Sequence, residues 1–144
     1  MRMKFYIGTD HAGFAIKKDV IALLKTHGCE VEDLGPATDE RVDYPDFGHK
    51  VALAVLKDTG SFGIVICGTG IGISLAANKH EGIRAALCHD AYTAQMARAH
   101  NNANILAFGQ RIVGLGVIES MLDAFISTPF EGGRHATRVD KIEC

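Results

Sequence analysis

The chain has 144 residues, of which 47% are apolar and 22% charged, which is typical of one soluble globular domain with its own core. A formal net charge of −2 argues against a general affinity for nucleic acid or membrane surfaces, and no apolar run is long enough to span a bilayer. Residues 1–4 lead into a short apolar stretch that soon meets Asp10 and His11, a poor signal peptide, so we expect a cytoplasmic protein.

The four cysteines, at positions 29, 67, 88 and 144, form no CxxC pair, and the chain is too large and too apolar to need disulfide crosslinks. We therefore expect neither structural disulfides nor a zinc site, and free thiols suit a reducing compartment. Cys29, Cys88 and Cys144 are expected to be small apolar side chains in the interior. Cys67 differs from them because a glycine-rich segment follows it directly.

In the first part of the chain, hydrophobic spacing predicts two strands that are each followed by a helix. Residues 4–8 are predicted to form a strand and residues 14–26 a helix, which a glycine shortly after it should end. Residues 30–34 alternate polar and apolar side chains, as an edge strand does. Residues 35–45 are rich in turn-forming residues and predict a loop, and a second helix is expected over residues 46–57.

In the rest of the chain the alternation continues. Residues 62–67 form a continuous apolar run, typical of a strand covered on both faces. The other predicted elements are a short helix through residue 79, a strand over 83–88, a helix over 91–100, a strand over 103–108, a helix over 114–126 and a last helix from about residue 133. Five strands, each followed by a helix, predict a single α/β domain over residues 1–144 with a doubly wound, parallel, five-stranded sheet. Because ligands of such sheets bind beyond the carboxyl ends of the strands, three segments are candidates: residues 10–11, 67–72 and 100–111.

The segment from Cys67 to Ser74 reads Cys-Gly-Thr-Gly-Ile-Gly-Ile-Ser. Its three alternate glycines permit a tight turn and close approach to a ligand, and the next helix points unpaired N–H groups at that place, which favours an anion. It is not a Walker P-loop, since no Gly-Lys-Ser/Thr follows, nor a GxGxxG motif, since position 73 is isoleucine. A strand-to-helix turn without any ligand is the alternative.

Cys67 is predicted to end a buried strand near a helix N-terminus, where a thiol is more readily ionised. A thiolate there could be a nucleophile, a metal ligand or a base. A metal lacks further ligands, and a cysteine phosphatase would need an arginine that closes the loop, where this chain has Ile71, Ile73 and Ser74. A base that removes a carbon-bound proton remains, with loop N–H groups to hold the resulting oxyanion. The alternative is a buried structural cysteine.

Two segments offer histidines. His100 is predicted at the end of a helix, where the helix dipole favours the charged form that a general acid needs, although it could also be a cap that faces water. Asp10 could orient the imidazole of His11, or it could cap the helix that follows. The histidines at positions 27, 49, 80 and 89 have no matched partner, and we expect them at the surface.

Arg134 and Arg138 are four residues apart, so a helix places both on one face. Two neighbouring guanidinium groups repel each other unless an anion joins them, and a phosphate accepts such a pair well. Gly132 and Gly133 permit a turn that directs the pair inward. The alternative is a solvated basic face.

These segments together resemble the ribose-5-phosphate isomerase B family and its relatives, the galactose-6-phosphate isomerase subunits. The matching stretches cover nearly the whole chain in the family's order, at residues 9–14, 43–46, 67–79, 100–104, 108–111 and 131–135. One subgroup of that family uses a glutamate base in the glycine loop. With Cys67 present and isoleucine at position 73, this chain resembles the cysteine-base subgroup.

The resemblance implies a role for each candidate residue. Cys67 would move the proton between C1 and C2, while Thr69 and the loop N–H groups would steady the enediolate. His100 would open the furanose ring as an acid, and Asp10 would handle hydroxyl protons. The implied substrate contacts are the phosphate ligands His11, Arg111, Arg134 and Arg138, the sugar contacts Asn101 and Tyr44, and the loop residues Gly68, Gly70, Ile71 and Gly72.

The family folds as a Rossmann-like three-layer sandwich and builds its site across a homodimer interface, with tetramers as a further possibility. The glycine loop would come from one subunit and His100 with its neighbours from the other. The implied reaction is aldose–ketose isomerisation of ribose 5-phosphate to ribulose 5-phosphate in the non-oxidative pentose phosphate pathway. It needs a base, an acid, an oxyanion cradle and a phosphate grip, so no metal or other cofactor is expected. Allose and galactose phosphates are alternative substrates between which the sequence does not decide.

Two other functions compete with an isomerase. A flavodoxin-like module that binds a phosphate ligand or mononucleotide would explain the glycine loop and the arginines but would leave Cys67 and His100 without a role. A catalytically inactive subunit of a hetero-oligomer would gain activity only with a partner chain.

Overall fold

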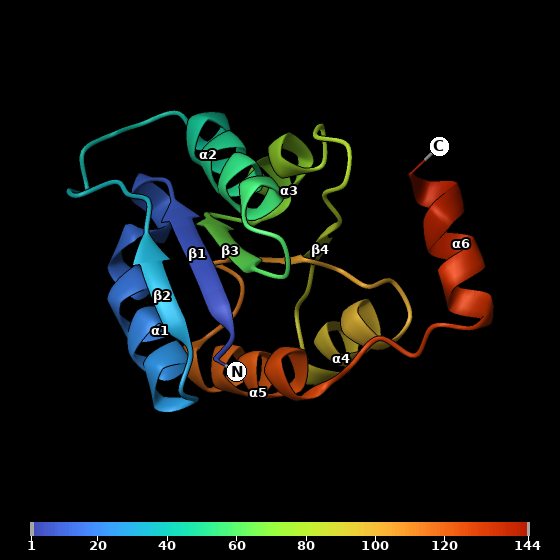
Figure 1. Cartoon of the computed structure of the whole chain (residues 1–144). Coiled ribbons are helices and arrows are strands. Elements are labelled where there is room, and N and C mark those ends of the chain that lie inside the picture. The colour runs from blue at the N-terminus through green and yellow to red at the C-terminus, as the bar shows by residue number, and fades with distance from the viewer. Residues whose placement is uncertain (1, 144) are drawn as a thin grey trace.

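The computed structural model describes residues 2–143, which form one parallel sheet and its surrounding helices (Figure 1). The strands are β1 (Lys4–Thr9), β2 (Glu30–Asp33), β3 (Phe62–Cys67), β4 (Ala85–Leu87) and β5 (Ile105–Gly109), in the spatial order β2-β1-β3-β5-β4. The helices are α1 (Phe14–Thr26), α2 (Tyr44–Lys57), α3 (Ile71–Ala77), α4 (Ala91–Ala99), α5 (Leu115–Ser127) and α6 (Arg134–Ile142), with a 3-10 turn, η1 (His11–Gly13), before α1. The predicted doubly wound five-stranded fold is therefore confirmed.

The sheet is covered on both faces (Figure 1). Helices α2 and α3 enclose one core with β3 and β5, which includes Val51, Val65 and Ile73. Helices α1, α4 and α5 enclose the second core on the opposite face, which is centred on Phe5 and Phe125. The last helix, α6, stands away from the sheet in Figure 1, and its buried side chains are His135 and Val139.

Several element boundaries differ from the prediction by one or two residues, and two of these differences have a clear local cause. Helix α2 begins at Tyr44, within the predicted loop, because Pro45 at the start of a helix fits its fixed φ and needs no N–H partner. Strand β4 is shorter than predicted. The backbone N–H groups of Arg84 and Ala85 donate to the side-chain oxygens of Asn104 (2.8 Å) and Asn78 (2.7 Å). These two groups therefore bond to side chains where a longer strand would have bonded to its neighbour.

The expectation of unpartnered surface histidines was wrong for three of them. His49 lies inside α2, and its Nδ1 is 2.7 Å from Nε2 of His80, with both residues half-buried. His27 contacts the Asp123 carboxylate and the Leu23 carbonyl, and these interactions raise its pKa, the backbone hydrogen bond most of all. The His49–His80 and His27–Asp123 partners lie far apart in the sequence, so no local pattern could indicate them.

The cysteines Cys29 and Cys88 are buried and unpaired, as predicted for small interior side chains. Burial raises the pKa of the Cys29 thiol and that of the Cys88 thiol, the latter to about 11. Cys144 lies outside the described residues. None of the helices in residues 2–143 combines the length and apolar character that crossing a membrane requires.

Candidate active site

The ends of β1 and β3 form the first part of the site. These neighbouring strands mark the point where the chain order reverses, since β2 lies on one side of them and β5 and β4 on the other. The Asp10 N–H donates to the Ile66 carbonyl (3.2 Å), which holds the two strand ends together. Such a reversal point is where open α/β sheets bind ligands.

Cys67 is the last residue of β3 and is 5% exposed. The Gly70 N–H donates to its sulfur, with 3.1 Å between N and Sγ. Gly70 has φ of +81°, and a Cβ there would lie 2.6 Å from the Phe108 backbone, so only glycine permits this turn. The turn thus brings a backbone hydrogen-bond donor to the Cys67 sulfur.

The remaining loop residues lie around the start of α3. The Thr69 hydroxyl accepts a hydrogen bond from the Ile71 N–H (3.2 Å), one of the N–H groups at the start of α3 that have no partner within the helix. A Cβ at Gly72 would lie 2.4 Å from the Tyr44 ring, so the tyrosine packs directly on the helix start. Tyr44 is 41% exposed and is available to a ligand placed over this turn.

Asp10 and His11 are not paired with each other. Asp10 Oδ1 accepts from the N–H groups of Ala12 (2.9 Å) and Gly13 (3.1 Å), so the carboxylate caps the following turn, as the alternative prediction had it. His11 Nδ1 accepts from the Val42 N–H (3.2 Å). A neutral His11 therefore carries its proton on Nε2 and can donate it to an anion.

Arg111 joins this group from the end of β5. The backbone N–H of Arg111 donates to the Gly68 carbonyl (3.1 Å). Its side-chain Nη1 is 3.2 Å from the point that a Cβ on Gly68 would occupy. Ten of the predicted site residues therefore share the carboxyl edge of the sheet, and we call them the carboxyl-edge group: Asp10, His11, Tyr44, Cys67, Gly68, Thr69, Gly70, Ile71, Gly72 and Arg111.

The prediction that residues 100–111 all lie at this edge was wrong. Strands β3 and β5 are parallel, with Cys67 opposite Gly109 and Gly63 opposite Ile105. His100 and Asn101 come before β5 and therefore lie at the amino edge, the length of the strand away, about 16 Å at 3.3 Å per residue. The reason is that α4 runs antiparallel to the strands, so its end returns to their starting edge.

His100 stacks on His135, the second residue of α6, with ring centroids 4.1 Å apart and planes 9° apart. Glu131 Oε1 lies 3.4 Å from Nε2 of His135 and 3.9 Å from that of His100. Burial lowers the pKa of His135 most, followed by repulsion from a protonated His100 and from Arg134. Nothing in the sequence analysis singled out His135 or Glu131 as site residues, because their link to His100 is made only by the fold.

The donor atoms of His100, Glu131 and His135 all lie within 4.8 Å of one another, which raises the question of a metal. An imidazole binds a metal along the nitrogen lone pair, which lies in the ring plane. Two stacked, nearly parallel rings direct their lone pairs along lines that do not meet at one ion. The rings of His100 and His135 are therefore not arranged to bind one metal ion together, and Glu131 lies within ion-pair distance of both.

Arg134 and Arg138 are exposed on α6, one turn apart as predicted. Gly132 (φ +70°) and Gly133 (φ +58°) form the predicted turn before them. Among residues 2–143, neither guanidinium has a carboxylate within 4.0 Å, so both are available to an external anion. With His100 and Asn101 they make up the amino-edge group.

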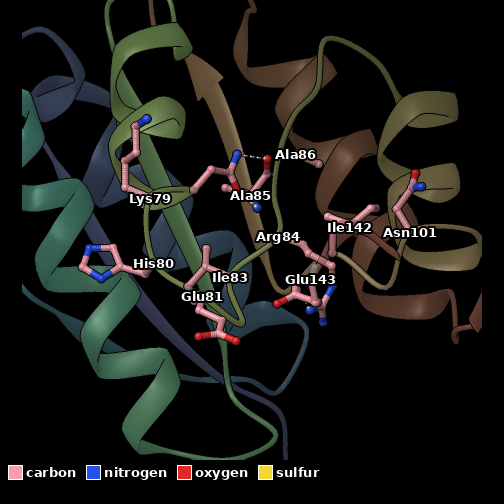
Figure 2. Close-up of a pocket in the computed structure, with 12 residues that line it drawn as sticks. Lys79, His80, Glu81, Ile83, Arg84, Ala85, Ala86, Asn101, Ile142 and Glu143 are labelled. Atoms are coloured by element: carbon pink, nitrogen blue, oxygen red, sulfur yellow. Dashed lines mark hydrogen bonds and ion pairs between the residues drawn. The ribbon is translucent and has the colours of Figure 1, made fainter. Parts of the chain in front are cut away.

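A pocket of about 580 Å³ lies between the α3–β4 turn and the end of α6 (Figure 2). It is lined by Asn78, Lys79, His80, Glu81, Ile83, Arg84, Ala85, Ala86, Asn101, Ala103, Ile142 and Glu143. Of the predicted site residues it contains only Asn101, and Cys67 lies elsewhere. One chain therefore holds the two groups of site residues apart.

Comparison with known proteins matches the family model described as Ribose/Galactose Isomerase to residues 5–142. The chain is 49% identical to ribose-5-phosphate isomerase B of Escherichia coli over 139 residues, which are 96% of this chain and 93% of that protein. It is also similar to two solved structures of such enzymes. The first, from Clostridium thermocellum, has a TM-score of 0.95, 55% identity and coverage of 98% and 95% of the two chains.

The second structure, a type B ribose 5-phosphate isomerase from Trypanosoma brucei, has a TM-score of 0.96, 45% identity and coverage of 99% and 98%. The match spans both groups of site residues, from the glycine loop to α6. The chain belongs to the ribose/galactose isomerase family.

Proposed function

We propose that this chain interconverts D-ribose 5-phosphate and D-ribulose 5-phosphate through an enediolate. The relatives named as ribose-5-phosphate isomerase B, at up to 55% identity over nearly the full chain, support the reaction. The observation that carries the chemistry is the Cys67 thiol, which ends β3 beneath a glycine loop and accepts the Gly70 N–H at 3.1 Å. A base next to a cradle of backbone donors is what proton transfer beside a carbonyl requires.

In the proton-transfer step, the Cys67 thiolate removes the hydrogen from C2 of the open-chain aldose. The electron pair forms the C1–C2 double bond, and the C1 carbonyl oxygen becomes an oxyanion that loop N–H groups and Thr69 stabilise. Protons then move between the two oxygens, with Asp10 as the assisting carboxylate. The thiol finally returns its proton to C1, and C2 becomes the ketone.

Ring opening precedes this step, and we assign it to His100, which would protonate the ring oxygen of the furanose. His100 and Cys67 lie at opposite edges of the sheet in one chain. We therefore propose a homodimer in which each site combines the carboxyl-edge group of one copy with the amino-edge group of the other. Exposed apolar side chains near these groups, Ile71 (51%), Leu75 (62%) and Ile142 (54%), suit such an interface.

The phosphate would be bound by four cationic or N–H-bearing side chains: His11, Arg111, Arg134 and Arg138. Tyr44 and Asn101 would contact the sugar hydroxyls. Because the phosphate lies far from the reacting carbons, its binding can hold the sugar and offset the cost of the reactive conformation. The base, acid, oxyanion cradle and phosphate ligands are all supplied by protein groups, so we propose a reaction without metal or cofactor, in the cytoplasm, where the free thiols stay reduced.

The direct test is incubation with ribose 5-phosphate and detection of ribulose 5-phosphate, with allose 6-phosphate and galactose 6-phosphate in the same panel. We expect turnover of the pentose phosphate and no effect of EDTA. Absence of turnover on every sugar phosphate, together with tight mononucleotide binding, would favour a binding module. Activity that appears only after addition of a different chain would favour an inactive subunit of a hetero-oligomer.

A further inference from the structure

Asn102 directly follows His100 and Asn101 and has a strained backbone. Its φ is +47°, and it is the one non-glycine residue with positive φ between residues 2 and 143. Asparagine tolerates the left-handed region better than most residues, yet the conformation still disfavours folding unless other contacts hold it. The contacts at Asn102 therefore determine the course of the turn that carries His100 and Asn101.

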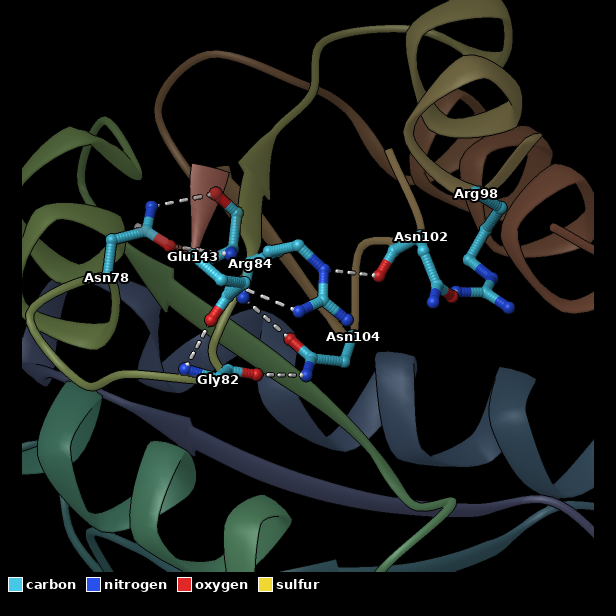
Figure 3. Close-up of polar contacts among 8 residues, drawn as sticks. Asn78, Gly82, Arg84, Arg98, Asn102, Asn104 and Glu143 are labelled. Carbon is cyan, nitrogen blue, oxygen red and sulfur yellow. Dashed lines mark hydrogen bonds and ion pairs between the residues drawn. The ribbon is translucent and has the colours of Figure 1, made fainter. Parts of the chain in front are cut away.

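Two arginines hold Asn102, one in α4 and one directly before β4 (Figure 3). Arg98 Nη1 donates to its side-chain oxygen (3.0 Å), and Arg84 Nε donates to its backbone carbonyl (2.9 Å). Arg98 is fixed by its surroundings, since its guanidinium lies 4.9 Å from the Phe62 ring centroid and 5.7 Å from that of Phe125. Burial, followed by the charge of Arg84, lowers the pKa of Arg98. Arg98 thus anchors the turn to the core.

Arg84 connects the same turn to α6. Its Nη1 lies 3.2 Å from Glu143 Oε1, and the two side chains are only 17% and 26% exposed. Glu143 directly follows α6, and its other oxygen accepts the Gly82 N–H (2.8 Å). One guanidinium therefore binds both the carbonyl of Asn102 and the residue that directly follows α6, as Figure 3 shows.

Helix α6 is held near its two ends by residues that bear on the site. At its first turn, His135 stacks on His100 at 4.1 Å. At its last turn, Glu143 binds Arg84, and between them Val139 is the other buried side chain. The His135–His100 stack and the bonds of Glu143 to Arg84 and Gly82 thus link the two ends of α6, the helix that carries Arg134 and Arg138, to the rest of the chain.

We infer that Arg84 is a positioning residue that sets the distance between the His100 turn and the arginines of α6. The inference rests on the proposed function, in which His100 opens the ring while Arg134 and Arg138 hold the phosphate. A furanose phosphate has a fixed span between ring oxygen and phosphate, so these two groups must be held at matching positions. Arg84 acts on these groups indirectly, through its bonds to the Asn102 carbonyl and to Glu143.

Three variants separate the link of Arg84 to α6 from the anchoring of the His100 turn. Arg84→Met removes both side-chain bonds of Arg84 and should lower kcat/KM for ribose 5-phosphate by roughly 10- to 100-fold, since a hydrogen bond to a charged group is lost on each side. Glu143→Gln weakens only the link to α6 and should raise KM several-fold at nearly unchanged kcat. Asn102→Gly keeps the backbone conformation and the carbonyl that Arg84 binds, but loses the side-chain bond to Arg98. It therefore loosens the other anchor of the His100 turn and should lower kcat more than it raises KM.

The matched control is Glu32→Gln, which removes the ion pair with Lys4 (3.5 Å) at the opposite end of the sheet and should change neither constant. Arg84→Lys, which keeps the charge near Glu143 but cannot reproduce both bonds, should recover KM more than kcat. It also covers the case in which Arg84→Met does not fold.

An activity-independent measurement separates this inference from the proposed function. Amide hydrogen exchange of Arg84→Lys should speed up in residues 100–103 and in α6, and stay at wild-type rates in α1 and α2. Exchange rates that stay at wild-type values in both segments would overturn the positioning role. So would changes in kcat and KM that are the same in Glu143→Gln as in Asn102→Gly. An inactive wild-type protein would refute the proposed function while leaving the exchange result interpretable.

Discussion

The carboxyl-edge group around Cys67 and the amino-edge group around His100 are built by different means. Close backbone packing shapes the first: a Cβ at Gly109 would lie 2.5 Å from the Thr69 backbone, and one at Gly13 would lie 2.6 Å from the Ile66 carbonyl oxygen. Side chains shape the second, through the His100–His135 stack and the bonds of Arg84 and Arg98 to Asn102.

This difference shows how a site can combine a rigid and an adjustable part. The group that transfers the proton sits on the sheet, where a shift requires movement of the core. The group that opens the ring and adds Arg134 and Arg138 to the phosphate ligands sits on a turn and on a helix, joined to the rest of the chain by side-chain contacts. Substitutions at the first group should therefore act on proton transfer or folding, and those at the second on ring opening and substrate placement.

The largest expected effect is that of Cys67→Ala. Removal of the base should lower kcat by about 10³-fold or more, because a positioned acid–base group contributes roughly 10² to 10⁴. Exchange of the C1 hydrogen of ribulose 5-phosphate with D₂O should be lost as well. Turnover close to wild type in a correctly folded variant would remove the thiol from the base role.

Gly70→Ala tests the backbone-built group. The new Cβ would meet the Phe108 backbone at 2.6 Å with φ at +81°, so we expect a loss of about 3 kcal/mol in the free energy of unfolding. Gly72→Ala is the matched control, since its Cβ meets only the ring of the exposed Tyr44, which can move aside. Chemical denaturation that shows equal loss in both variants would contradict the rigid-loop account.

His100→Ala tests the assignment of roles between the two groups. Conversion of ribose 5-phosphate should fall by about 10²-fold, since ring opening loses its acid. Ribulose 5-phosphate cannot form a furanose, because its C5 oxygen carries the phosphate, so exchange at its C1 in D₂O should stay within a few-fold of wild type. Equal losses in the two measurements would place His100 in the proton-transfer step.

Arg138→Ala should have a smaller effect, confined to binding. We expect KM to rise roughly 10-fold with kcat little changed, because the phosphate contact is made equally in the ground and transition states. Lys57→Ala removes an exposed cation at the end of α2 and is the control. An unchanged KM would mean that the phosphate binds elsewhere.

The carboxyl-edge group could be predicted because its signals are local. Glycine spacing identified the loop, and the continuous apolar run of residues 62–67 located β3 without error. The helix over residues 14–26 was equally clear from its spacing and from the glycine that follows it, which has φ of +79°. Parallel strand ends then bring Asp10, Cys67 and Arg111 to one edge as a consequence of topology.

The amino-edge group could be predicted only in part. His100, Asn101, Arg134 and Arg138 were proposed from helix ends, spacing and family resemblance, but the edge assigned to His100 was wrong. The contacts that hold them, from His135, Arg84 and Glu143, join residues far apart in the sequence. Asn102 carried a weak signal, since asparagine after a helix often adopts positive φ.

The most direct test of the two-copy site is complementation between Cys67→Ala and His100→Ala. The two chains are co-expressed with different affinity tags, and mixed dimers are isolated by sequential purification. If each site takes Cys67 from one copy and His100 from the other, the mixed dimer has one intact site and one doubly defective site, so it should regain about half the wild-type activity. Mixed dimers as inactive as either parent would contradict a shared site.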